Sequence, residues 1–295
     1  MSETILVTGA AGQLGQRVLH HLTETYGVAP ATIVAASRDP QKLAAFAAKG
    51  IATRKVDFDD AASLSAAFAD IDRLLLISTD ELATPGKRLV QHKAAVEATV
   101  RAGVKHIAYT SMPSPDDSLV SFAGDHAGTE QAIKASGLTY TILRDAWYHD
   151  NYLHSMPHNL QTGTWYSASG DGRVATISRD DCAKAIAAAL ASGSNDSATY
   201  TLTGTPSLTD KEIAATAAEA SGKPLAVVTV TDEQLLQGLQ GAGLPDFFAK
   251  VLVTADANTR AGKFDIVTDD FKRLTGGEPQ SLRDFFAANK AALIG

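Results

Sequence analysis

Three things are scarce in this 295-residue sequence: cysteine, basic charge and long apolar runs. Its single cysteine, Cys182, has no partner within the chain for a disulfide, which is typical of a reducing compartment, so a cytoplasmic protein is expected. The formal net charge of -7 argues against nucleic acid as a bulk electrostatic partner. No run of about 18 apolar residues occurs, and no charged segment precedes an apolar one at the start, so we expect neither a membrane span nor a signal peptide.

Two kinds of catalytic site are missing as well. The chain has no G-x-S-x-G motif, which excludes a serine hydrolase built on that turn. His149, His154 and His158 are close in the chain, but no H-E-x-x-H motif accompanies them, and Pro157 is expected to interrupt a regular helix there. We therefore expect no metal site.

The chain does have a glycine-rich turn near its start. An apolar strand at residues 4–7 runs into a G-x-x-G-x-x-G sequence, a helix is expected over 16–22, and a second strand at 32–36 completes one βαβ unit. Glycines in such a turn let the backbone approach a pyrophosphate, which the N-terminus of the following helix attracts. The cofactor contacts predicted in this turn are Gly9, Ala10, Ala11, Gly12, Gln13, Leu14 and Gly15.

The tip of the second strand indicates which dinucleotide is bound. Folds that bind NAD usually carry Asp or Glu there for the ribose 2′-hydroxyl, whereas the 2′-phosphate of NADP needs positive charge. Here the strand ends in Ser37 and Arg38, and Lys42 follows about one helical turn later. Because a guanidinium binds phosphate through paired hydrogen bonds, Arg38 and Lys42 predict NADPH. The alternative is that both are solvated surface residues beside Asp39.

The fold class predicted from the alternation of short apolar strands and amphipathic segments is α/β, with a parallel sheet. Residues 1–145 are expected to form a Rossmann-like doubly wound domain, and 146–295 a smaller C-terminal α/β substrate lobe that is partly interleaved with it. Further strands are expected at 51–56, 73–77, 104–109 and 139–143, and helices at 40–49, 60–69, 87–102 and 125–135.

The second half of the sequence is harder to interpret. Asp180 precedes an alanine-rich helix over 181–191 and is expected to be its N-cap. Later elements are expected at 199–202 (strand), 209–221 (helix) and 225–230 (strand), followed by a mobile loop containing Gly238, Gly241 and Gly243.

Polar residues follow several of the expected strands. In a doubly wound sheet, ligands bind beyond the carboxyl ends of the strands. Each such residue has a structural alternative, because Ser, Thr and Asp after strands often cap turns or helices. The predicted contacts are Asp57 and Phe58 with the adenine, Ser78 and Thr79 with the ribose or pyrophosphate, and Ser111 and Asp145 with the nicotinamide end.

Aromatic residues gather after the sixth strand. Trp147, Tyr152 and Trp165 are candidate substrate contacts, because aromatic faces with a few polar tips suit a flat ligand. The alternative is that these side chains form the core of a domain interface.

Five segments carry a combined pattern, at 9–14, 37–40, 74–78, 103–111 and 143–152. Together they resemble the NmrA-like atypical short-chain dehydrogenase/reductase group, in particular its bacterial quinone oxidoreductases of type 2, with triphenylmethane reductases as close relatives. The resemblance implies that the glycine turn and the arginine after the second strand bind NADPH. It also implies that the nicotinamide is lined by Leu143, Arg144, Asp145, Ala146, Trp147 and Tyr148.

The chain departs from that group at two positions. Ala11 stands where the group usually has Thr, and Asp145 where it usually has Asn. The second difference changes the hydrogen bonding expected at the nicotinamide carboxamide.

A catalytic pair of the wider superfamily is also absent, since His126 and Glu130 stand in the neighbourhood of its Tyr-x-x-x-Lys. A ketone needs a proton for the basic alkoxide that forms. Hydride addition to a quinone gives a stabilised phenolate instead, so holding the acceptor against the nicotinamide supplies most of the catalysis. Candidate proton donors are Ser111, His126 and Tyr148, and His126 has a capping or core role as its alternative.

The sequence therefore predicts an NADPH-dependent oxidoreductase that transfers hydride to a quinone or a similar flat conjugated acceptor. The alternatives are a non-catalytic NADP(H)-binding redox sensor of NmrA type, or a reductase of dyes, imines or ketones. The partner is a small aromatic molecule, and the sequence is compatible with a homodimer.

Overall fold

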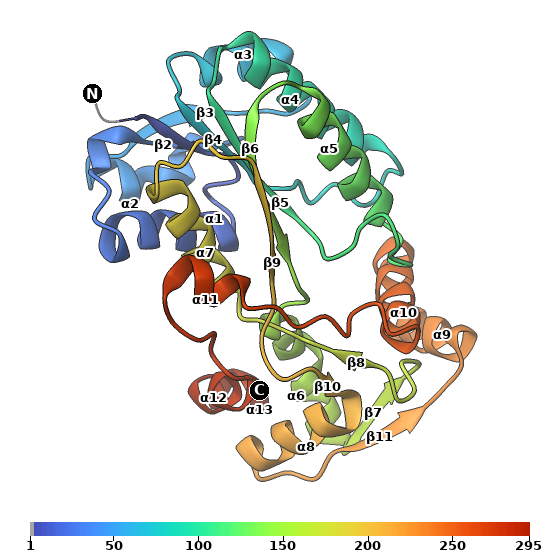
Figure 1. The fold of residues 1–295 in the computed structure, drawn as a ribbon. Coiled ribbons are helices and arrows are strands. Elements are labelled where there is room, and N and C mark those ends of the chain that lie inside the picture. The colour runs from blue at the N-terminus through green and yellow to red at the C-terminus, as the bar shows by residue number, and fades with distance from the viewer. Residues whose placement is uncertain (1–2) are drawn as a thin grey trace.

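A seven-stranded parallel sheet forms the centre of the computed structural model, which describes residues 3–295 (Figure 1). Its strands are β1 (Ile5–Val7), β2 (Ile33–Ser37), β3 (Ala52–Lys55), β4 (Arg73–Leu76), β5 (His106–Ser111), β6 (Thr139–Asp145) and β9 (Ala198–Leu202). They lie in the order β3-β2-β1-β4-β5-β6-β9, so the direction of winding reverses beside β1. Ligands of doubly wound folds bind at this reversal, beyond the carboxyl ends of the strands.

Helices cover both faces of the sheet. Successive strand residues point to opposite faces, so Val7 belongs to the core that contains α1 and α7, whereas Leu6 belongs to the core that contains α3 and α4. The first layer consists of α1 (Gln13–His20), the π-helical η1 (His21–Thr25), α7 (Arg179–Ala191) and α11 (Asp270–Thr275). The second layer consists of α3 (Ala61–Phe68), α4 (Lys87–Arg101) and α5 (Ala123–Ala135), and the short η2 (Pro30–Thr32), η3 (Pro40–Leu43) and α2 (Ala44–Ala47) flank β2.

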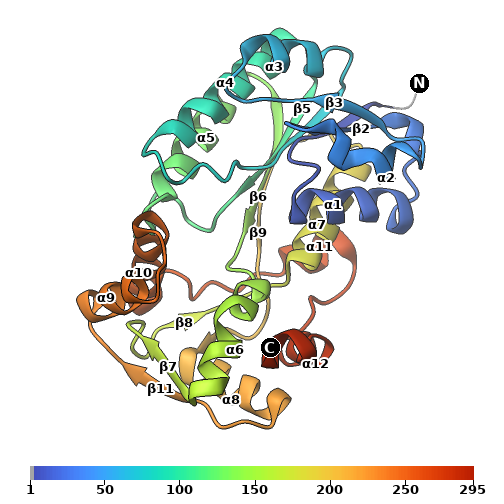
Figure 2. The same ribbon diagram turned by 180° about the vertical axis from the view of Figure 1, so that it is seen from behind.

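The remaining elements build a smaller lobe at one end of the sheet, towards which β6 and β9 lead (Figure 2). Although they follow residue 146, α7, β9 and α11 pack in or on the large sheet, so the chain passes between the two parts more than once. The lobe has its own core, which includes Met156 and Phe286. Its elements are η4 (His149–Asn151), α6 (Tyr152–Thr162), β7 (Thr164–Ser167), β8 (Arg173–Val174), β10 (Leu208–Thr209), α8 (Asp210–Ser221), β11 (Ala226–Thr229), α9 (Asp232–Gly241), α10 (Asp246–Arg260), α12 (Leu282–Ala288) and α13 (Lys290–Ile294).

The predicted α/β class and parallel sheet are confirmed, whereas the expected N-cap of α7 is wrong. The N-cap is Ser178, whose hydroxyl accepts a hydrogen bond from the Asp181 amide at 3.0 Å. Asp180 lies in the first turn, and its carboxylate approaches the His21 ring to 3.3 Å. An acidic residue in this turn is favourable even when it does not cap, because it faces the positive end of the helix dipole.

Two breaks expected from proline and glycine are wrong as well. The helix α6 continues through Pro157, because the buried Met156 and Leu160 anchor it on both sides of the proline. Gly238 and Gly241 belong to α9, so only residues 242–245 separate α9 from α10. The expected helix at 40–49 divides into η3 and α2.

Within residues 3–295 no helix is long and apolar enough to cross a membrane.

Candidate functional site

The glycine turn joins β1 to α1 in a close-packed form. Gly9 has a φ of +60°, which L side chains rarely adopt. A Cβ on Gly15 would lie 2.4 Å from the Gly9 carbonyl oxygen, so the helix packs directly on the turn. The N-cap of α1 is Gly12, which has no side chain to bond the first amides of the helix. These amides and the positive end of the helix dipole are therefore available to an anion such as a pyrophosphate.

The end of β2 carries an exposed cationic side chain. Arg38 is 74% exposed, and its Nη2 lies 3.8 Å from Asp80 Oδ1, a weak surface contact that a phosphate can replace. The neighbouring Asp39 is the N-cap of η3, and its Oδ1 accepts a hydrogen bond from the Gln41 amide. Lys42 is exposed on the same short helix. Two exposed cations at the end of β2 are an arrangement that can hold a 2′-phosphate.

The other predicted contacts lie along the carboxyl edge of the sheet. Asp57 accepts from the Asp59 amide at 3.1 Å and so shapes the turn after β3, with Phe58 half-buried beside it. After β4, the Ser78 amide donates to Thr110 Oγ1 at 2.9 Å. The Thr79 amide likewise donates to a ring nitrogen of His92 at 3.0 Å. These bonds fix the backbone along which a dinucleotide would lie.

Asp145, at the end of β6, forms a buried pair with Tyr148. The tyrosine hydroxyl donates to Asp145 Oδ2 at 2.7 Å, while Oδ1 has no hydrogen-bond partner among residues 3–295. Burial raises the pKa of Asp145 to about 7, which donation from Tyr148 and the Cys182 thiol offsets only in part. Burial and the neighbouring carboxyl also raise the pKa of Tyr148. Tyr148 therefore keeps its proton at neutral pH, and the Asp145 carboxyl takes one up as the pH falls below about 7.

Arg179, at the start of α7, connects this pair to the glycine turn. Its guanidinium lies 4.7 Å from the centre of the Tyr148 ring, a cation–π contact. Its Nη1 donates to Gln13 at 2.8 Å and to Asp150 at 2.9 Å. One side chain thus ties the N-terminus of α1 to the segment after β6, although the three parts are far apart in the sequence.

Ser111 belongs to a buried ion-pair cluster. Its hydroxyl donates to Glu130 Oε1 at 2.7 Å, and Arg144 binds both carboxylate oxygens of Glu130 at 2.9 and 2.7 Å. Burial by itself would raise the pKa of Glu130, but the bonds from Arg144, Ser111 and Lys134 hold it below its usual value. The proton of Ser111 therefore points to a carboxylate rather than to a substrate.

His126 lies deep in a polar network between α4 and α5. Arg88 Nη2 donates to its Nε2 at 3.1 Å, so the ring proton is on Nδ1, which lies 2.8 Å from the Tyr109 oxygen. Burial, and next the charge of Arg88, lower the pKa of His126 well below its usual value. A neutral ring with both nitrogens engaged fits the structural alternative for this residue better than a proton donor.

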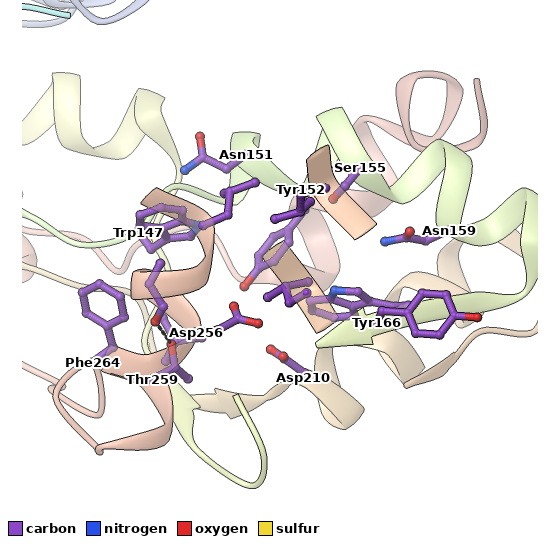
Figure 3. A pocket seen from close by; sticks show the side chains of 16 residues that line it. Trp147, Asn151, Tyr152, Ser155, Asn159, Tyr166, Asp210, Asp256, Thr259 and Phe264 are labelled. Atoms are coloured by element: carbon purple, nitrogen blue, oxygen red, sulfur yellow. Dashed lines mark hydrogen bonds between the residues drawn. The ribbon is translucent and has the colours of Figure 1, made fainter. Parts of the chain in front are cut away.

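The smaller lobe contains a cavity of about 200 Å³ lined by all three aromatic residues predicted to contact substrate (Figure 3). Trp147, Tyr152 and Trp165 come from the segment after β6, from α6 and from β7. Two carboxylates, Asp210 and Asp256, also line it. Because Trp147 follows Asp145 by two residues, one short segment contributes both to the sheet edge and to this cavity.

Sequence reasoning missed several side chains that shape the site. Arg179 stands directly before an acidic pair whose pattern predicts only the start of a helix, and no motif marks Arg88 in the predicted helix 87–102. Asp210 and Asp256 had no motif to mark them. Within residues 3–295 no group of three or more His, Cys, Asp or Glu side chains is arranged to hold a metal ion.

A glycine turn, an uncapped helix N-terminus and a doubly wound sheet together define a dinucleotide-binding protein. The sequence profile described as NAD(P)H-binding matches residues 9–193, more than half of the chain. The chain therefore belongs to the NAD(P)H-binding family. The resemblance drawn from the motifs and the predicted class of enzyme, an NAD(P)H-dependent oxidoreductase, are confirmed.

Individual relatives span nearly the whole chain. It is 38% identical over 262 residues to quinone oxidoreductase 2 of Escherichia coli (strain K12), covering 88% of this chain and 90% of the relative. It is 28% identical over 290 residues to an NAD(P)H azoreductase of Xenophilus azovorans, covering 98% of each. The crystal structure of the Escherichia coli NADPH-dependent quinone oxidoreductase with NADPH superimposes with a TM-score of 0.92 at 35% identity, over 97% of this chain and 99% of that one. For Citrobacter sp. triphenylmethane reductase with NADP(H), the TM-score is 0.91 at 32% identity, over 98% and 100%.

Proposed function

We propose that this protein is an NADPH-dependent reductase of quinones or similar flat conjugated acceptors. The observation that carries the proposal is the position of Trp147, which lies in the segment that ends β6 and also forms a wall of the aromatic cavity. An acceptor in that cavity would lie next to the segment expected to line the nicotinamide. The relatives named for quinone reduction and the NADPH-bound structure support the same assignment.

Cofactor binding is assigned to the carboxyl edge of the sheet. The free amides at the start of α1 would hold the pyrophosphate, and Arg38 with Lys42 the 2′-phosphate. The segment Leu143, Arg144, Asp145, Ala146, Trp147 and Tyr148 would border the nicotinamide, which supplies the hydride when bound.

The proton donors available in the site favour an acceptor whose reduced product is a stabilised anion. Ser111 donates to Glu130, and His126 is neutral with its Nε2 occupied by Arg88. The Tyr148 hydroxyl likewise donates to Asp145, so none of the three candidate donors directs a free proton at a substrate in this arrangement. A phenolate-like product needs little more than this, whereas a ketone would require a stronger arrangement.

The test is NADPH oxidation, followed by loss of the reduced nicotinamide absorbance, with NADH measured in parallel and with the nonenzymatic rate subtracted. A benzoquinone and a naphthoquinone serve as acceptors. Quinone-dependent oxidation that is faster with NADPH is expected. Tight NADPH binding without turnover on quinones, dyes or ketones would instead establish a redox sensor. The proposal includes a cytoplasmic location, and light scattering on the purified chain distinguishes a monomer from a homodimer.

A further inference from the structure

An ion pair spans the carboxyl edge of the sheet at the glycine turn. The strand β1 lies between β2 and β4. The turn after β1 is bonded to both neighbours, since the Thr8 amide donates to β4 and the Ala10 amide to β2, each at 3.0 Å. Arg38 follows β2 and Asp80 follows β4, so their contact at 3.8 Å joins the two sides of this turn. The adenosine end of a dinucleotide bound at the turn would lie beside this pair.

Asp80 belongs to a segment that α4 holds in place. On one side of it, the Thr79 hydroxyl donates to Gln91 Oε1 at 3.0 Å. On the other side, Glu81 Oε2 lies 3.4 Å from Lys87 Nζ. Both partners belong to α4, so the backbone of Asp80 is tethered at both neighbours and keeps its carboxylate near the end of β2.

A second acidic side chain near Arg38, Asp59, already has its own donors. Its Oδ1 accepts a hydrogen bond from Gln91 at 3.1 Å, and its Oδ2 lies 3.2 Å from Lys87 Nζ. The bonds from Gln91 and Lys87, with a smaller effect of the Arg38 charge, hold the pKa of Asp59 below its usual value. The charge of this carboxylate is therefore shared with α4 and is not free for a ligand.

Asp80, by contrast, contacts a single cation. Among residues 3–295 the only cationic group within 4 Å of its carboxylate is Arg38, and a separation of 3.8 Å is too long for a hydrogen bond. The Asp80 side chain is 90% exposed. Both members of the pair are therefore available to the group that a dinucleotide carries on its adenosine ribose.

The two forms of that ribose would use the pair in opposite ways. A 2′-phosphate would take Arg38 from Asp80 and leave the carboxylate facing a second negative group, which repels it. A 2′-hydroxyl needs an acceptor instead. A carboxylate reaching in from the segment after β4 can supply this acceptor in place of the acid that NAD-binding folds usually carry after the second strand. Removing the charge of Asp80 should thus favour one cofactor and not the other.

We propose that Asp80 sets the cofactor choice of this protein: its carboxylate accepts a hydrogen bond from the ribose 2′-hydroxyl of NADH and opposes the 2′-phosphate of NADPH. The protein then uses both dinucleotides, and its preference for NADPH is smaller than Arg38 and Lys42 alone would give. This inference rests on the proposed function, because it uses the assignment of the 2′-phosphate to those two cations.

The experiment measures binding rather than turnover. The full chain is titrated calorimetrically with NADP⁺ and with NAD⁺, which differ only in the 2′-phosphate, and the preference is the Kd for NAD⁺ divided by the Kd for NADP⁺. Asp80→Asn should lower the Kd for NADP⁺ about three- to tenfold, the scale of one exposed charge interaction, and should not lower the Kd for NAD⁺. Asp80→Lys should raise the preference further, because it adds a cation beside the phosphate.

Glu97→Gln is the matched control. Glu97 Oε2 lies 3.7 Å from Arg101 Nη1, and the Glu97 side chain is 71% exposed, so this pair resembles that of Arg38 and Asp80 in length and exposure. The variant removes the same single charge from a position about 15 Å further along α4 than Lys87. Its preference should equal that of the wild type.

Equal preferences in the wild type, Asp80→Asn and Asp80→Lys would overturn the inference. An equal gain in affinity for both dinucleotides would overturn it too, because the pair would then only cover the turn. If the wild-type chain binds neither dinucleotide, the cofactor assignment and the inference are both wrong. A shifted preference without quinone turnover would refute the proposed reductase and leave the role of Asp80 intact, whereas quinone turnover with an unshifted preference would do the reverse.

Discussion

Replacing Asp145 by asparagine tests the protonation of the buried pair beside α1 through the free energy of unfolding. Burial raises the pKa of this carboxyl from 3.8 to about 7. The folded protein then binds a proton that the unfolded chain has released between these pH values. The contribution of Asp145 to stability therefore falls as the pH rises through this window and is constant above it. The gap between the two pKa values means that ionisation of Asp145 lowers the free energy of unfolding of the wild-type protein by about 4 kcal/mol at alkaline pH.

Asp145→Asn removes the ionisation and keeps the shape. In the wild-type protein, ionisation lowers the free energy of unfolding by about 1.5 kcal/mol at a pH of about 5 and by the full 4 kcal/mol at about 8.5. Between these two pH values the free energy of unfolding of the variant should therefore rise by about 2.5 kcal/mol relative to that of the wild type. The unpaired amide of the new side chain costs the same at both pH values and cancels. The assay is urea unfolding followed by tryptophan fluorescence at each pH.

Asp171→Asn is the matched control, because Asp171 is exposed and its bond from Lys211 lowers its pKa. The free energy of unfolding of that variant relative to wild type should change little as the pH rises, and in the opposite direction. If Asp145→Asn and wild type differ by the same amount at both pH values, Asp145 is already ionised at the lower one. The account of a proton-holding pair at Tyr148 would then be wrong.

Two further predictions concern the cofactor site. Arg38→Ala should raise the KM for NADPH by roughly 5- to 150-fold, the effect of losing about 1–3 kcal/mol of charge-assisted bonding, and should leave the KM for NADH nearly unchanged. Equal increases in initial-rate measurements would remove Arg38 from the phosphate site. Gly15→Ala places a Cβ 2.4 Å from the Gly9 oxygen and should abolish NADPH binding in calorimetric titration, whereas Gly124→Ala, where nothing lies within 4 Å, should not. Retained affinity in the first variant would show that the turn can move without loss of the site.

The Rossmann half was predictable because its signals are local. Glycine spacing, a polar residue after each strand and the alternation of apolar segments all follow from the backbone conformation of single elements. In the smaller lobe, by contrast, local sequence signals do not decide the secondary structure. Proline at 157 disfavours a helix by its own propensity, yet buried neighbours on both sides outweigh it. Such outcomes depend on contacts that no short window of sequence contains.

The chemistry of a candidate residue also depends on contacts between elements that are distant in the sequence. Ser111 lies at the end of β5 and His126 within α5, and what each can do depends on its partner. Glu130 accepts the proton of Ser111, and Arg88 donates to His126. A histidine that accepts from a buried guanidinium cannot protonate a substrate from that nitrogen, whatever position it inherits in a catalytic motif. Protonation states are properties of clusters, and the partners in each cluster come from different elements. The sequence therefore identifies candidate catalytic residues, but the structure is needed to choose among them.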